Sequence, residues 1–189
     1  MSKRNALLPA AVFGALFLTS AVIGPVVAQD KMSGEKTVMV GGAPMFPSKN
    51  IIQNAVNSKD HTTLVAAVKA AGLVETLEGK GPFTVFAPTN AAFGKLPAGT
   101  VDTLVKPENK PTLTKILTYH VVPGKLEASS LTNGKKLKTV EGEELTVKLA
   151  DGKVWIVDAK GGSAAVTIAN VNQSNGVIHV VDTVLMPAS

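Results

Sequence analysis

The chain has 189 residues, a formal net charge of +5, one Trp, one Tyr and no cysteine. Without cysteine it forms no disulfide and no thiol-linked lipid anchor, and cysteine-based metal sites are excluded. The only arginine is Arg4, and arginine is the preferred partner of phosphate and guanine, so we expect no nucleic-acid partner.

Residues 1–28 have the pattern of a signal peptide. Lys3 and Arg4 are positively charged, residues 6–23 are uncharged and mostly apolar, and residues of small or modest size end at Ala28. The alternative is an uncleaved anchor, since about 18 apolar residues can just span a bilayer. We expect cleavage near Ala28, no membrane insertion after signal cleavage, and a secreted or periplasmic product.

The chain that follows the signal has the size of a single domain. Residues 29–49 are rich in Gly and Pro and lack sustained periodicity, which predicts an extended or disordered N-terminal arm. Residues 50–187 are long enough to bury a core of their own, so we expect one globular domain that begins near Asn50.

Apolar residues at helical spacing follow the arm. They predict a helix over 51–56 and another from His61 to Leu77, with Asp60 as the N-cap of the second. Gly72 is expected to divide the second helix. Further short helices are expected at 100–105 and 112–117.

The segment from Gly81 to Leu96 predicts a strand that turns directly into a helix. Its first part is β-branched and aromatic, and Pro88 ends the strand. Thr89 and Asn90 are both good helix N-caps, because a side-chain oxygen there accepts from unpaired backbone N–H groups.

Two of the six phenylalanines lie on either side of this corner. Phe86 belongs to the predicted strand and Phe93 to the predicted helix. Two large apolar side chains so placed indicate that the corner has a core on both sides.

Beyond residue 124 the apolar pattern changes from helical spacing to short extended runs. Asp151-Gly152 is the clearest hairpin signal, because both central residues of a type I′ turn need positive φ. The expected strands are 136–140, 145–150, 154–157, 165–171 and 177–181. Helices followed by antiparallel strands predict an α+β fold rather than repeated βαβ units.

Three segments together resemble the fasciclin-like (FAS1) domain family. Residues 84–93, 117–122 and 175–185 are similar, in order and spacing, to its first conserved segment, its Tyr-His motif and its second conserved segment. The resemblance covers 50–187 and is closest to single-domain secreted bacterial fasciclin proteins. The motif residues are Thr84, Phe86, Pro88, Thr89, Asn90, Phe93, Tyr119, His120, Gly176, Ile178, His179 and Asp182.

The resemblance implies a single α+β domain, a β-wedge of antiparallel or mixed strands with several short helices packed along it. It implies a role in adhesion, no enzymatic reaction and no cofactor. Asn90 and Ala91 stand where many members carry an acidic pair, although Asn90 can still cap a helix. We find no acidic-aliphatic adhesion motif like those of animal relatives, so integrin binding is not expected.

The domain has three histidines, and a metal site on them is disfavoured. His120 and His179 are far apart in the sequence, and neither has a second His at ligand spacing or an adjoining acidic cluster. We expect His120 to be buried and to hydrogen-bond the corner at Thr89 or Asn90. His179 is expected in the core, or at its rim, on a central strand.

A hydrolase built on His179 and Asp182 is a further alternative. No serine lies in a Gly-x-Ser-x-Gly turn, and no glycine loop fits a nucleotide fingerprint. We therefore expect no catalysis.

The expected function is a secreted, non-catalytic adhesion or binding module. It would contact a cell-surface or extracellular protein or polysaccharide as a monomer, through surfaces that the motifs do not mark. The alternative is a small-molecule or lipid-binding secreted domain, which requires an apolar cavity on the order of several hundred Å³.

Overall fold

Most of the described chain is short helices and strands, with the helices mainly in the first half. The computed structural model describes residues 36–188, so the predicted signal peptide and the start of the arm lie outside the described residues. The α-helices are α1 Ile51–Ala55, α2 Thr62–Ala71, α3 Val74–Glu78, α4 Asn90–Gly94, α5 Thr100–Leu104 and α6 Lys110–Tyr119. Three 3₁₀ turns are η1 Lys59–His61, η2 Pro107–Asn109 and η3 Ala128–Ser130.

The strands form a small hairpin and one seven-stranded sheet. The hairpin consists of β1 Val38–Val40 and β2 Ala43–Met45. The large sheet has the order β4-β3-β9-β8-β7-β6-β5, and only its β3–β9 pair is parallel. Its strands are β3 Phe83–Pro88, β4 Val121–Pro123, β5 Lys136–Lys138, β6 Glu144–Ala150, β7 Lys153–Val157, β8 Ser163–Gln173 and β9 Gly176–Val181.

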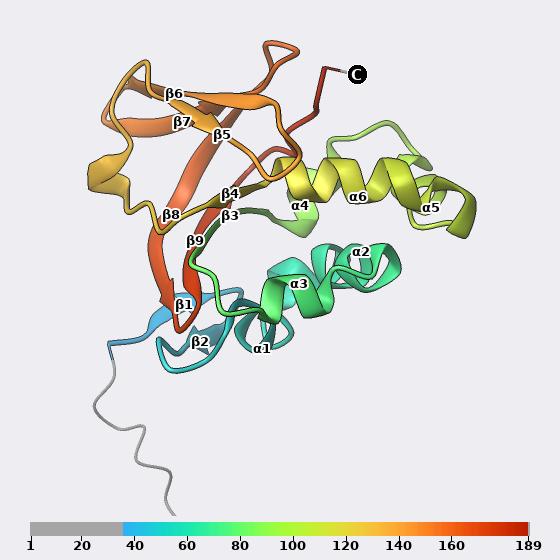
Figure 1. Ribbon diagram of the computed structural model, residues 1–189, viewed down its shortest axis with the longest axis horizontal. Coiled ribbons are helices and arrows are strands. Elements are labelled where there is room, and N and C mark those ends of the chain that lie inside the picture. The colour runs from blue at the N-terminus through green and yellow to red at the C-terminus, as the bar shows by residue number, and fades with distance from the viewer. Residues whose placement is uncertain (1–35, 189) are drawn as a thin grey trace, which may run out of the picture. The chain divides into compact units, whose positions relative to one another are not determined.

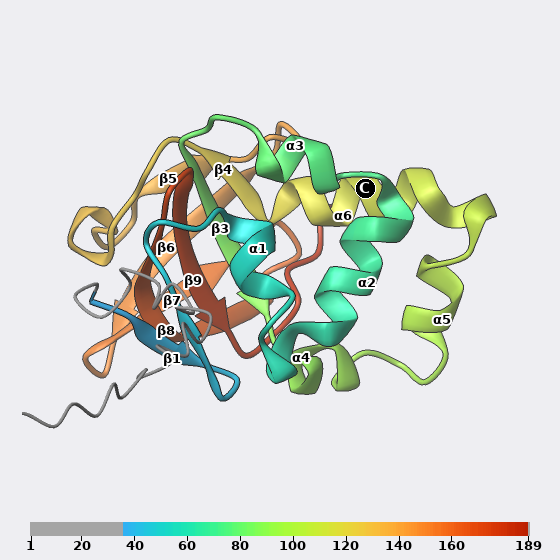
Figure 2. The ribbon, with the colours of Figure 1, turned by 90° about the horizontal axis from the view of Figure 1, so that it is seen from below.

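Helices and strands gather at different sides of this part of the chain. In Figures 1 and 2 the α-helices lie beside β3 and β9, whereas β5, β6 and β7 extend away from them. The prediction of an α+β fold with a mixed sheet and several short helices is confirmed.

Strands β3 and β9 separate two apolar cores, because successive side chains of a strand point to opposite faces. Val85 and Ile178 belong to the core shared with the helices. Phe86 and Val181 belong to the second core, together with residues of β5, β6 and β7. The chain curls around this second core, and the N–H of Val140 donates to the carbonyl of Val121 at 2.8 Å.

The corner after β3 has a core on both sides, as predicted. Phe93 is 7% exposed and packs in the core beneath the helices, whereas Phe86 is fully buried in the second core. Thr89 caps α4, and its hydroxyl accepts from the N–H of Ala92 at 3.2 Å.

The folded chain begins before Asn50, which corrects the predicted boundary of the arm. Gly41 and Gly42 both have positive φ and form the turn between β1 and β2. Val40 and Met45 are each 3% exposed and belong to the core under the helices. The glycines therefore form a hairpin turn rather than a break in the fold.

The long predicted helix is divided at Gly72, as expected. Gly72 has φ of 73° and caps the end of α2, a left-handed conformation that glycine adopts without strain. The expected Asp60 cap is wrong, because a 3₁₀ turn precedes α2 and Asn90 supplies the capping oxygen. Its Oδ1 accepts from the N–H of Thr63 at 3.0 Å.

Among residues 36–188, no helix is both long and apolar enough to cross a membrane.

Candidate functional site

The three motif segments meet on three adjacent strands, β4, β3 and β9, at one end of the strand order. Strand β3 pairs in parallel with β9, and Phe86 lies opposite His179 in their register. The same strand pairs with β4 on its other side, where Thr84 lies opposite Val122. Residues that are 38 and 93 positions apart in the sequence are therefore paired within one continuous region.

The His120 side chain is buried at 2% exposure, between α6 and the C-terminal segment. Its Nδ1–H donates to the carbonyl of Ile116 at 2.8 Å, and its Nε2 accepts from the N–H of Leu185 at 2.9 Å. These partners correct the predicted contact with Thr89 or Asn90. Burial lowers the pKa of His120 to about 4, which keeps the imidazole neutral and able to accept at Nε2.

The His179 side chain is fully buried on β9, the central strand predicted for it. Its Nε2–H donates to the carbonyl of Leu126 at 2.7 Å, and its Nδ1 lies 3.3 Å from the N–H of Asn170. The imidazole stacks on Phe86 with a centroid distance of 5.7 Å. Burial lowers the pKa of His179.

These contacts argue against general-base chemistry at either motif histidine. Each imidazole has both ring nitrogens bonded to backbone groups, so neither has a nitrogen free to take a proton from a substrate. Asp182 bonds the N–H of Ala165 at 2.9 Å and lies 3.5 Å from the ammonium of Lys95. It therefore does not orient His179 as a triad carboxylate would.

Asp182 is partly exposed at the edge of the second core. Partial desolvation acts to raise its pKa, but the hydrogen bond from Ala165 and the nearby Lys95 hold that pKa below its ordinary value. The carboxylate thus ties the start of the C-terminal segment to β8. Across residues 36–188, no three His, Asp or Glu side chains converge where they would hold a metal ion.

Two motif hydroxyls, one on strand β3 and one at the end of α6, bond to the backbone of loops. The hydroxyl of Thr84 donates to the carbonyl of Gly124 at 2.6 Å and accepts from the N–H of Leu126 at 2.8 Å. The Tyr119 hydroxyl, at the end of α6, accepts from the N–H of Ala159 at 2.8 Å. Burial raises the pKa of Tyr119.

Asn90 connects two helix starts. Besides accepting from Thr63, its amide donates at 2.9 Å to the carbonyl of Lys59 and to the hydroxyl of Thr62. A carboxylate at this position could not donate these two hydrogen bonds, because an ionised carboxylate only accepts. Pro88, the last residue of β3, precedes Thr89 and lies opposite Val181.

Gly176 and Ile178 serve the packing of β9. A Cβ at Gly176 would overlap the carbonyl oxygen of Phe83, so the parallel strands approach too closely for any side chain there. Ile178 is 6% exposed and packs in the core beneath the helices.

Sequence reasoning missed several buried amides. Asn175, in the turn between β8 and β9, accepts from the N–H of Ile51 at 3.0 Å and donates to the carbonyls of Leu77 and Gly79 at 2.6 and 2.9 Å. It thereby holds the start of α1 and the end of α3. The sequence feature that could have pointed to Asn175 is the Asn175-Gly176 pair, but this pair alone indicates only a turn.

A second missed amide is Asn54, which is fully buried. It bonds both the N–H and the carbonyl of Phe46, at 3.0 and 2.8 Å, and its Nδ2 also donates to Gln173. The available signal was a polar residue within the apolar run 51–56.

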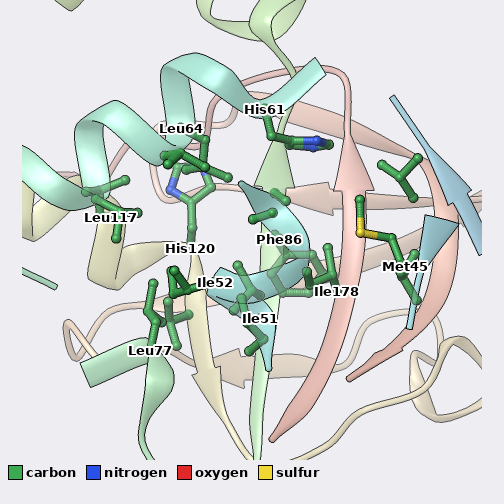
Figure 3. Close-up of a pocket in the computed structure, with 18 residues that line it drawn as sticks. Met45, Ile51, Ile52, His61, Leu64, Leu77, Phe86, Leu117, His120 and Ile178 are labelled. Carbon is green, nitrogen blue, oxygen red and sulfur yellow. The ribbon is translucent and has the colours of Figure 1, made fainter. Parts of the chain in front are cut away.

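A small cavity lies between α1, α2 and the sheet, and Figure 3 shows the side chains that line it. Its volume is about 40 Å³ and its accessible lining is apolar. Ligand pockets for small molecules are usually about 300 Å³ or larger and present a few polar groups for orientation. The cavity does not fit the small-molecule or lipid alternative.

Comparison with known proteins gives a consistent family assignment. The sequence profile of the Fasciclin domain matches residues 59–187. Protein sll1483 of Synechocystis sp. is 51% identical over 172 residues, which cover 90% of this chain and 92% of that protein. The cell surface glycolipoprotein MPB83 of Mycobacterium bovis is 39% identical over 138 residues, 70% of this chain and 58% of that protein.

A solved structure shows the same fold. It is a FAS1 domain pair from the insect cell adhesion molecule Fasciclin I, with a TM-score of 0.67 and 17% sequence identity. The alignment covers 80% of this chain and 58% of that one.

Proposed function

Because the chain belongs to the fasciclin domain family, which is non-catalytic and associated with cell adhesion and extracellular binding, we propose that it is an exported binding module. It attaches to a protein or polysaccharide of the cell surface or the surrounding matrix. Family membership is the observation that carries this proposal. The motif residues, on this proposal, stabilise the fold, because their polar groups are engaged within the domain.

Export is the second part of the proposal. The pattern of residues 1–28 supports cleavage near Ala28, and a related protein is described as a cell surface glycolipoprotein. We place the mature protein in the periplasm or the medium, as a monomer without cofactor.

The test is crosslinking on living cells of the native host that produce the tagged chain. The proposal predicts a mature N-terminus near Gln29, recovery outside the cytoplasm, and covalent capture of the same envelope or matrix component in repeated experiments. The same tag on an unrelated exported protein serves as the control. Retention in the cytoplasm, or capture no different from the control, would overturn the proposal.

A further inference from the structure

The outer face of strands β6, β7 and β8 carries the only tryptophan in the chain. Along β7 the side chain of Ile156 points into the second core, so its neighbour Trp155 points outward. Trp155 lies opposite Lys148 on β6 and Ala165 on β8. The indole is partly exposed.

A groove runs beside this indole. Its volume is about 460 Å³, and Trp155, Val157 and Ala150 give it an apolar floor. Lys148, Asp151 and Ser163 add a cation, a carboxylate and a hydroxyl, and all three are exposed. In Figure 1, β6 and β7 lie away from helices α1–α6.

The same face has an excess of positive charge. Lys148 and Lys153 are exposed, and neither forms an ion pair with any of residues 36–188. On the neighbouring strand, Lys136 pairs with Glu144 at 3.2 Å, whereas Lys138 adds a further positive charge. The unpaired ammonium groups favour a ligand with negative charges.

We infer that this groove binds an anionic polysaccharide whose sugar units carry carboxylates; the inference rests on the proposed function and names its partner. The C–H face of a pyranose ring stacks on the flat indole of Trp155, and the lysines bind its carboxylates. Asp151 and Ser163 hydrogen-bond sugar hydroxyls.

An acidic polypeptide fits this surface less well. Asp151 would repel the carboxylates of either ligand, but a uronate also has hydroxyls that donate to the Asp151 carboxylate, and the side chains of an acidic polypeptide do not. Stable protein interfaces also bury about 800 Å² on each partner around an apolar centre, and the apolar floor here is limited to a few small side chains beside one indole.

Trp155 provides its own readout, because it is the only tryptophan in the protein. The mature protein is titrated with a hexamer of mannuronic acid while tryptophan fluorescence is recorded. Maltohexaose is the neutral control of equal length, and hexaglutamate is the polypeptide control of equal charge. We expect a saturable change with the uronate, and binding weaker by about tenfold or more for both controls.

Two charge reversals locate the binding. Lys148→Glu should weaken uronate binding by about fivefold or more, whereas Lys69→Glu, the same change at an exposed position on α2, should leave it unchanged. Trp155→Ala should no longer be retarded in a native gel containing alginate. Unfolding midpoints show that each variant is folded, and if Trp155→Ala is not, Lys148→Glu decides the result.

Three outcomes overturn the inference. They are no saturable change with the uronate, equal binding by Lys148→Glu and the wild type, and binding of hexaglutamate or maltohexaose as strong as that of the uronate. If the wild-type protein is nevertheless captured on its own cells, the exported binding function stands and only the assignment of this groove fails.

Discussion

The Nε2 atom of His120 lies 2.9 Å from the backbone nitrogen of Leu185, 65 residues later in the chain. This hydrogen bond fastens the C-terminal segment to the end of α6. The other ring nitrogen bonds the carbonyl of Ile116, so the imidazole bridges two buried backbone groups. Removing it should therefore affect the whole domain.

His120→Ala should lower the free energy of unfolding by about 1–3 kcal/mol, because two buried backbone groups lose their partner. Urea unfolding at pH 8 measures this loss. Lys69→Ala, an exposed change on α2, is the control and should shift the midpoint little. A midpoint unchanged in His120→Ala would refute the bridging role.

Stability should fall as the pH drops from 6.5 to about 4. Burial lowers the pKa of folded His120 to about 4, whereas the unfolded side chain titrates near its ordinary 6.5. In this window the unfolded state binds the additional proton, so the contribution of His120 is complete above pH 6.5 and is lost as the pH falls through 4. Its size is on the order of 3 kcal/mol.

Urea midpoints between pH 8 and 4 test this dependence. Burial also lowers the pKa of His61 and His179, so these two histidines add to the dependence of the midpoint on pH. The midpoint of His120→Gln should therefore still fall with pH, but less steeply than that of the wild type. Equal slopes in the wild type and His120→Gln would exclude His120 as a source of the pH dependence.

Gly176→Ala should destabilise the domain by about 3 kcal/mol, because the new methyl group would overlap the backbone of Phe83 in the neighbouring strand. Gly94→Ala is the matched control. No atom lies within 4 Å of a Cβ at this helical position, so the change should be neutral or stabilise by up to about 1 kcal/mol. Thermal unfolding compares the two, and equal effects would contradict the close strand approach.

Asn175→Ala should lower the free energy of unfolding by about 3 kcal/mol. The change leaves the N–H of Ile51 and the carbonyls of Leu77 and Gly79 without their partner. Asn57→Ala is the control, since this exposed amide donates one hydrogen bond among residues 36–188, to the carbonyl of Gln53. Hydrogen exchange should show faster opening of α1 and α3 in Asn175→Ala but not in Asn57→Ala. Protection unchanged in both helices would count against this role.

Features encoded by neighbouring residues were predictable from the sequence. Asp151 and Gly152 have φ of 53° and 71°, as the two central residues of the expected type I′ turn require. The strand at 165–171 was also expected, although β8 extends to Ser163–Gln173 and contains register shifts. Strand ends and bulges depend on pairing partners, which local sequence does not reveal.

Contacts between distant segments were not predictable in the same way. A buried histidine needs two partners, but sequence does not show that those of His120 are Ile116 and Leu185. The cap that Asn90 provides for α2 lies 27 residues from Thr63. Burial of Asn175 by two helices depends likewise on tertiary packing.

The most direct test of the account measures stability and binding together in two variants, His120→Gln and Lys148→Glu. Urea midpoints give stability, and retention on native-host cells well below each unfolding temperature gives binding. We predict a lower midpoint with unchanged retention for His120→Gln, and an unchanged midpoint with reduced retention for Lys148→Glu. Loss of retention by folded His120→Gln, with full retention by Lys148→Glu, would contradict the separation of a fold-stabilising motif from a surface binding site.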